Sequence, residues 1–115
     1  MIAVIFESQP LPGRQQDYLN AGEALRAELE RADGFVSIER FESLTQPGKL
    51  LALSFWRDEE AVRQWRNLAL HRRIQYSSRH NIFADYRLRV AEVRRDYTLR
   101  DRSQAPADSL ASLPA

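Results

Sequence analysis

Five residues in the second half of the chain have side chains that could act together on a small molecule: Trp65, Asn67, His71, Arg72 and Tyr76. His71 is the natural base, because the pKa of an ordinary imidazole lies near neutrality. Asn67, Arg72 and Tyr76 follow closely in the sequence and offer polar partners. Trp65 precedes His71 by six residues, which places the two about 240° apart around a continuous helix. Both can border one cavity only if the helix bends between them.

Other kinds of catalytic chemistry lack the residues they need. The chain contains no cysteine, which excludes disulfides, thiolate nucleophiles and iron–sulfur clusters. Its two histidines, His71 and His80, match no common metal-binding spacing. No glycine-rich phosphate loop, nucleophile elbow or dinucleotide fingerprint is present. We therefore expect no metal site.

The composition is that of one ordinary globular domain. The 115 residues are 43% hydrophobic and 29% charged, and the formal net charge of +1 provides no field for holding nucleic acid. The apolar start at residues 1–6 has no basic flank and meets Glu7, so it predicts neither a signal peptide nor a membrane span. We expect a cytoplasmic protein without a nucleic-acid or membrane partner.

The apolar pattern predicts four strands and two helices. The strands are expected at residues 2–6, 35–44, 49–57 and 82–96. The first helix is expected from residue 14 to about 32, ended by Asp33 and Gly34. It carries one buried stripe made of Tyr18, Gly22, Leu25 and Leu29.

The second helix is expected to begin after Asp58, a good N-cap residue. Glu59 and Glu60 then lie in the first turn, where the helix dipole favours anions. Its apolar stripe consists of Ala61, Val62, Trp65 and Leu68. A break is expected near residues 68–70, with helix resuming over 71–79.

The order β-α-β-β-α-β predicts an α+β protein with a ferredoxin-like antiparallel sheet and two helices on one face. One set of apolar residues would lie under the helices: Ile2, Val4, Phe6, Val36, Ile38, Leu51, Leu53, Phe55, Leu88 and Val90. A second set would point the opposite way: Ala3, Ile5, Phe35, Phe41, Leu50, Ala52, Trp56 and Phe83. If the two sets exchange faces, one apolar face of the sheet is still left without helices to cover it. Because two helices cannot cover both faces, we expect two copies of the chain to pack sheet to sheet.

Three groups of residues together resemble the antibiotic biosynthesis monooxygenase family. They are the strand beginning at Gly34 and Phe35, the junction at residues 53–61, and the helical segment containing Trp65, Asn67 and His71. The resemblance covers about residues 1–97. It implies a domain at residues 1–98, a tail at 99–115, and a homodimer of the dimeric α+β barrel type. The tail has small, polar and proline-containing composition, and the sequence leaves open whether it docks on a partner subunit.

Members of that family often use molecular oxygen without flavin or metal. The resemblance therefore implies a cofactor-independent monooxygenase that deprotonates and oxidises a small aromatic or polycyclic, hydroquinone-like compound. Such a site needs a base, a water-excluding wall and a donor for the developing oxygen anion. His71 would be the base and Asn67 or Arg72 the donor, with Trp65 as a wall. The expected contacts to the apolar or aromatic ligand are Trp56, Phe6, Tyr76, Phe83 and Tyr86.

Haem degradation is the alternative enzyme activity within the same superfamily. Such enzymes resemble one another in a first-strand Asn, a Trp on the second helix, and a ligand His about ten residues later. Trp65 matches, but Phe6 or Glu7 occupies the first-strand position and Gln75 the position ten after Trp65. His71 would be about one turn too early, so haem would require a shifted geometry.

Each of these residues also has a structural interpretation. Trp65 can be a core residue, Trp56 an anchor of a dimer interface, and His71 a surface or helix-start residue. Arg40, Arg87 and Arg89 can form cross-strand ion pairs with Glu39, Glu42 and Asp85. A dimer that binds a small ligand without catalysis therefore stays open as a third hypothesis.

Overall fold

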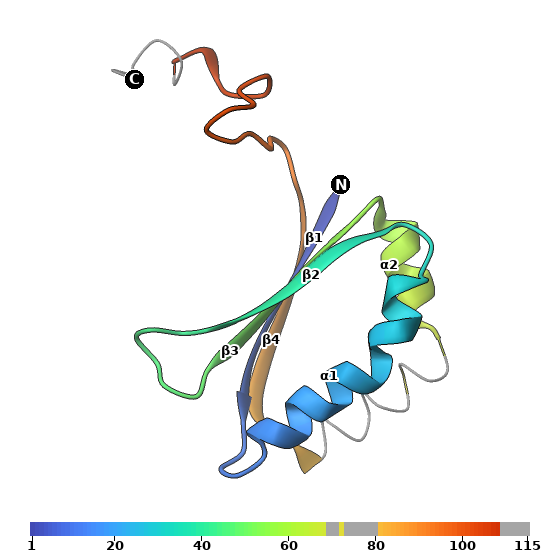
Figure 1. Cartoon of the computed structure of the whole chain (residues 1–115), viewed down its shortest axis with the longest axis vertical. Helices are drawn as coiled ribbons and strands as arrows, with labels where there is room; N and C mark the ends of the chain where they lie inside the picture. Colours follow the sequence, from blue (N-terminus) through green and yellow to red (C-terminus); the bar gives the residue numbers. More distant parts are fainter. Residues whose placement is uncertain (69–71, 73–80, 109–115) are drawn as a thin grey trace.

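The protein is described by a computed structural model whose elements follow the expected order, and the structure describes residues 1–68, 72 and 81–108. The elements are β1 (Ile2–Pro10), α1 (Gln15–Glu30), β2 (Phe35–Glu42), β3 (Leu50–Trp56), α2 (Glu59–Arg66) and β4 (Phe83–Glu92). The strands form one antiparallel sheet in the order β2-β3-β1-β4. Both helices lie on the same side of it (Figure 1). The predicted ferredoxin-like α+β fold is confirmed.

Strand β1 is longer than the predicted 2–6. Glu7, Ser8 and Gln9 continue the strand, because β1 is central and pairs with both neighbours: Ser8 lies opposite Leu50 in β3 and Tyr86 in β4. A register shift next to Pro10 ends the pairing. Strand β4, in contrast, ends at Glu92 instead of running to residue 96.

The sheet register shows which side chains share a face. Val4 lies opposite Ser54, and Phe6 lies opposite Ala52. Cross-strand partners point the same way, so the even-numbered residues of β3 face the helices together with Val4 and Phe6.

The predicted face assignment was therefore wrong for β3. Leu51, Leu53 and Phe55 lie on the open side of the sheet with Ala3 and Ile5, whereas Leu50, Ala52 and Trp56 face the helices. Phe35 and Phe83 were also placed on the wrong side, since both pack against the buried clusters beneath the helices. The surplus of apolar residues on the second face nevertheless exists.

The open side of the sheet is apolar at its centre and charged at its border. We call the set Ala3, Ile5, Phe41, Leu51, Leu53 and Phe55 the open sheet face. At its border the Glu7 carboxylate lies 2.8 Å from Arg89 and 3.4 Å from Lys49. A hydrogen bond from Lys49 is the main cause of the lowered pKa of Glu7, and Arg89 adds to it. Arg89 thus pairs with Glu7 and not with the carboxylates predicted from the sequence.

A close approach between α2 and the turn after α1 explains Gly34. Its φ of +81° favours glycine, and an added Cβ would lie 2.5 Å from the Cβ of Ala61. Ala61 is 1% exposed, so neither side can move away easily. The predicted end of the first helix at Asp33 and Gly34 is confirmed to within a few residues, since α1 ends at Glu30.

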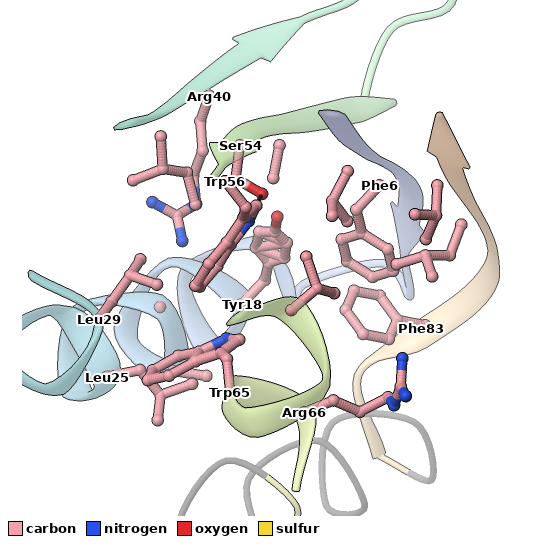
Figure 2. Close-up of a pocket in the computed structure, with 18 residues that line it drawn as sticks. Phe6, Tyr18, Leu25, Leu29, Arg40, Ser54, Trp56, Trp65, Arg66 and Phe83 are labelled. Atoms are coloured by element: carbon pink, nitrogen blue, oxygen red, sulfur yellow. Dashed lines mark hydrogen bonds between the residues drawn. The ribbon is translucent and has the colours of Figure 1, made fainter. Parts of the chain in front are cut away.

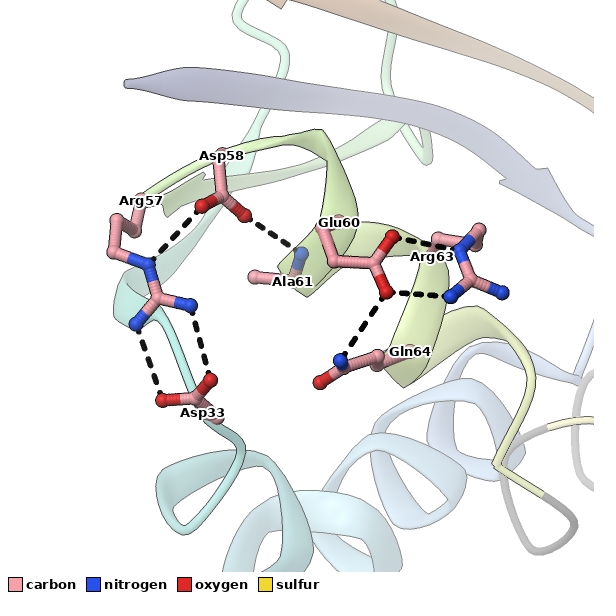
Figure 3. A network of polar contacts seen from close by, with 7 residues as sticks. All are labelled: Asp33, Arg57, Asp58, Glu60, Ala61, Arg63 and Gln64. Atoms are coloured by element: carbon pink, nitrogen blue, oxygen red, sulfur yellow. Dashed lines mark hydrogen bonds and ion pairs between the residues drawn. The ribbon is translucent and has the colours of Figure 1, made fainter.

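Asp58 begins α2 and joins it to the preceding turn (Figure 3). Its carboxylate accepts the backbone N–H of Ala61 at 2.9 Å, as predicted for an N-cap. Arg57 donates to Asp58 at 3.1 Å and makes two bonds to Asp33, at 2.9 and 3.1 Å. The Ala61 N–H is the largest cause of the lowered pKa of Asp58, followed by Arg57. The ion pair ties the turn after α1 to the start of α2.

We expect Asp58→Ala to lower the Tm by about 4 °C, because the first turn of α2 loses its cap. Asp58→Asn is the matched variant, since Asn caps about as well but does not titrate in acid. The folded-state pKa of Asp58 lies below its usual value of 3.8, so its contribution is present at neutral pH and is lost as the pH falls through the lowered value. Thermal denaturation between pH 7 and 2 should therefore show a weaker acid dependence in Asp58→Asn than in the wild type. Equal acid dependence would contradict this assignment.

The chain leaves the sheet after β4 and extends away from it as an arm (Figure 1). Local bonds organise this arm: Gln104 accepts the N–H of Asp96 at 2.9 Å, and Arg102 lies 5.0 Å from the ring centroid of Tyr97. Residues 93–108 thus have structure of their own beyond the predicted domain boundary at 98.

Candidate functional site

A cavity of about 240 Å³ lies between the sheet and the two helices. The sheet forms its floor through Val4, Phe6, Ile38, Arg40, Ala52, Ser54, Trp56, Phe83, Leu88 and Val90. The helices contribute Tyr18, Ala21, Gly22, Leu25 and Leu29 from α1, and Val62, Trp65 and Arg66 from α2. Most of this surface is apolar (Figure 2). The cavity is therefore suited to a small hydrophobic molecule.

Aromatic rings form one wall of the cavity. Phe6 and Phe83 meet edge to face with ring centroids 5.6 Å apart, and Tyr18 meets Phe83 at 5.5 Å. Tyr86 lies 5.7 Å from Phe6, behind the rings that line the cavity. Such offset and edge contacts hold aromatic rings in fixed orientations. A ring bound in the cavity could therefore stack on the face of one aromatic side chain and contact the edge of another.

Two tryptophans form the opposite wall. Trp56 is 2% exposed, and its ring centroid lies 6.1 Å from that of Trp65 and 5.4 Å from that of Phe35. Its indole N–H donates to the hydroxyl of Ser54 at 3.0 Å, which satisfies the buried donor. Trp56 is thus a core residue and a cavity residue at once.

The charged residues of the lining are both cations. Arg40 comes from β2 and Arg66 from the last turn of α2. No carboxylate is among the described residues that line the cavity. Within the described residues, the wall therefore carries positive charge that no lining carboxylate neutralises.

The structure places the predicted site residues in three groups. Trp56, Trp65, Phe6 and Phe83 line the cavity, and Tyr86 supports it from behind. Asn67 and Arg72 are exposed and hydrogen-bonded to each other, and neither is among the lining residues. His71 and Tyr76 lie outside the described residues. The catalytic roles of these residues stay predictions.

Several cavity residues were not predicted as site residues. The stripe of Tyr18, Gly22, Leu25 and Leu29 was identified, but only as the buried side of a helix. Arg40 was assigned to surface ion pairs, yet it makes none with the described carboxylates and lies in the cavity wall. Its even position in β2, opposite Ala52, was the available signal.

This arrangement defines a class: a ferredoxin-like domain with a small-molecule cavity between its sheet and its helices. A model of the family described as "Antibiotic biosynthesis monooxygenase" matches residues 1–76. The chain belongs to this antibiotic biosynthesis monooxygenase family, as its sequence predicted.

Similar proteins fall into two kinds. A jasmonate monooxygenase from Pyricularia oryzae is 45% identical over 93 residues, which are 81% of this chain and 43% of that protein. The chain thus spans less than half the length of this relative. The solved structures are more distant in sequence.

A candidate antibiotic biosynthesis monooxygenase from Deinococcus radiodurans superposes with a TM-score of 0.75 at 16% identity, over 86% of this chain and 98% of that one. A Mycobacterium tuberculosis protein gives a TM-score of 0.74 at 18% identity, over 84% and 98%. These two structures establish the fold. Among the described helices, none has the length and hydropathy needed to cross a membrane.

Proposed function

We propose that this protein is a cofactor-independent monooxygenase that oxidises a small hydroquinone-like compound of one or two rings with molecular oxygen. The observation that carries the proposal is the apolar, aromatic-walled cavity of about 240 Å³. This volume lies below the roughly 300–1,000 Å³ of many ligand pockets, which favours a small ring compound over a large polycycle. Family membership supports the oxygen chemistry.

The proposed reaction requires no external reductant. One ring C–H of the hydroquinone becomes C–OH with one oxygen atom, and the ring is oxidised to the quinone. The two phenolic hydrogens lost in that oxidation leave with the second oxygen atom as water. Deprotonation of the substrate makes it electron-rich enough to reduce oxygen, and a dry cavity prevents competing hydrolysis of the intermediates. Phe6, Phe83, Trp56 and Trp65 would exclude water, and His71 stays the proposed base.

Oxygen uptake with a panel of one- and two-ring hydroquinones tests this proposal. We expect uptake that depends on enzyme concentration, with one oxygen consumed per product, and slower uptake by His71→Ala. If the panel compounds bind but no oxygen is consumed, the protein is a small-molecule binding dimer and the proposed activity is wrong.

Jasmonate is a second candidate substrate, favoured by the 45% identity to the Pyricularia oryzae enzyme. It is a small acid with one ring and an apolar chain, which suits a cavity with apolar walls and two arginines. Conversion of a C–H bond to an alcohol would consume two electrons that the substrate does not supply. The uptake assay should therefore include jasmonate with and without an added two-electron donor.

We expect hemin titration to give no saturable change in the Soret band. The first-strand position where the haem-degrading enzymes have an Asn is Phe6 or Glu7 here. Glu7 lies on the open side of the sheet, and the ring of Phe6 packs against Tyr18 and Phe83 and offers no hydrogen bond. A tetrapyrrole also exceeds a cavity of about 240 Å³. Stoichiometric hemin binding that His71→Ala removes would replace the proposed activity with haem degradation.

We also propose that two copies pair through the open sheet face. Apart from the buried Ala3, its residues are partly buried or exposed in the single chain, and Phe41 is 42% exposed. The charged border formed by Glu7, Lys49 and Arg89 resembles the polar rim of a protein interface.

A further inference from the structure

Arg40 lines the cavity from β2 and, like its chain neighbours Glu39 and Phe41, is exposed. It occupies the same row across the sheet as Ala52 and Phe6. Its guanidinium carbon lies 6.0 Å from the centroid of the Tyr18 ring, at the outer limit of a cation–π contact. Figure 2 shows the guanidinium reaching from β2 toward α1. The side chain is directed into the site.

Gly22 makes room for this arginine. A Cβ at residue 22 would lie 2.6 Å from Nη2 and 3.1 Å from Cζ of Arg40. Glycine inside a helix is unfavourable relative to alanine, so its presence in the middle of α1 needs a reason. The space taken by the guanidinium supplies one.

Arg40 has no anionic partner in the described part of the chain. Arg26, Arg57 and Arg63 each form ion pairs on the surface, whereas Arg40 forms none. No described carboxylate lines the cavity either. A guanidinium whose donors are available matches the geometry of a carboxylate, which it can bind with two parallel hydrogen bonds.

We propose that Arg40 binds the carboxylate of an apolar organic acid, whose hydrocarbon part fills the aromatic end of the cavity. The inference rests on the proposed function for the identity of the site, and it adds the substrate class. Arg40 is then the residue that selects acids over neutral compounds of the same shape. Gly22 is the positioning residue that lets Arg40 reach the cavity.

A matched pair of ligands tests the charge preference without turnover. We would titrate the protein with 4-phenylbutyrate and with 4-phenylbutyramide, and follow the fluorescence of Trp56 and Trp65. A charge-assisted hydrogen bond corresponds to about tenfold or more in affinity, so the acid should bind at least about tenfold more tightly than the amide. Arg40→Leu should reduce this ratio to about one, mainly by weakening the binding of the acid.

Three further variants separate recognition from folding. Gly22→Ala should reduce the acid preference by displacing the guanidinium, although alanine favours the helix. Arg40→Lys keeps the charge without the two-pronged donor geometry and should retain part of the preference. Arg26→Leu removes a cation from the solvent side of α1 and should change nothing. Circular dichroism checks that each variant is folded.

Several results would overturn the inference. These are equal binding of acid and amide, no binding of either, or an acid preference that survives Arg40→Leu. If the preference for the acid is lost in Arg66→Leu but kept in Arg40→Leu, Arg66 and not Arg40 binds the carboxylate. Acid-selective binding without oxygen uptake would support the role of Arg40 and contradict only the proposed function. Oxygen uptake with neutral compounds, together with no acid preference, would support the proposed function and contradict the role of Arg40.

Discussion

Trp56→Ala should destabilise the protein by about 3–5 kcal/mol, the range typical of removing a large buried aromatic side chain. Trp56 is the largest side chain that is almost fully buried, at 2% exposure. It contacts the rings of Phe35 and Trp65 and belongs to the cluster that includes Leu29 and Val62. Its loss also removes the hydrogen-bond donor to Ser54. Because the neighbouring cavity is already open, the remaining side chains cannot fill the space.

Urea denaturation followed by far-UV circular dichroism measures this effect. Trp65→Ala is the matched variant, since Trp65 is only partly buried and lies more on the cavity than in the core. We expect a smaller loss of stability for Trp65→Ala and a larger loss of ligand affinity. A loss below about 1 kcal/mol for Trp56→Ala would mean that the core packing described for this residue is wrong.

Leu53→Asp should convert the proposed homodimer into a monomer. Leu53 lies opposite Ile5 on the open sheet face, with Phe55 and Leu51 on the same strand. In a sheet-to-sheet pair, an aspartate there would be buried without a partner, which costs several kcal/mol and raises the dimer Kd by more than about 100-fold. In the monomer the same aspartate reaches solvent, so the fold should persist.

Light scattering coupled to size exclusion at micromolar concentration distinguishes the two states. Leu19→Asp is the control, because Leu19 is an exposed leucine of α1, 39% accessible, outside the open sheet face. We expect the wild type and Leu19→Asp to be dimers and Leu53→Asp to be a monomer. A wild type that is monomeric would refute the proposed pairing.

The order of helices and strands could be predicted because apolar residues repeat at a different spacing in helices than in strands. Tyr18, Gly22, Leu25 and Leu29 repeat at helical spacing, and all four line the cavity. The short connection between β2 and β3 also left an antiparallel hairpin as the natural arrangement. The topology then followed from the order of the elements.

The sequence could not predict which side of β3 faces the helices, because its odd-numbered and its even-numbered residues are both apolar. Leu51, Leu53 and Phe55 alternate with Leu50, Ala52 and Trp56, so hydrophobicity alone does not select a side. The register with β1 decides it, and register is a property of the folded sheet. The length of β1 was missed for a related reason: Glu7 is polar but belongs to a central strand, where Lys49 and Arg89 neutralise it.

The structure brings predicted aromatic residues together around the cavity, whereas the roles of the predicted polar residues stay predictions. Phe6, Phe83, Trp56 and Trp65 were chosen as cavity residues and do line it. Arg40 was missed because an arginine between Glu39 and Phe41 in a strand is usually an ion-paired surface residue. Its even position in β2 was a signal for the helix side of the sheet, and the cavity lining and the close approach of Gly22 show that its side chain turns inward.

Two separate buried clusters support the ends of the cavity, one around Trp56 and Leu29 and the other around Tyr18 and Ile82. A small molecule bound between these clusters would extend the hydrophobic interior across the cavity. Occupancy at 100 times the Kd would add about 2.7 kcal/mol to the free energy of unfolding. Binding of the proposed ligand would thus be linked thermodynamically to folding, and a thermal-shift screen of organic acids would detect it without an assay of the reaction.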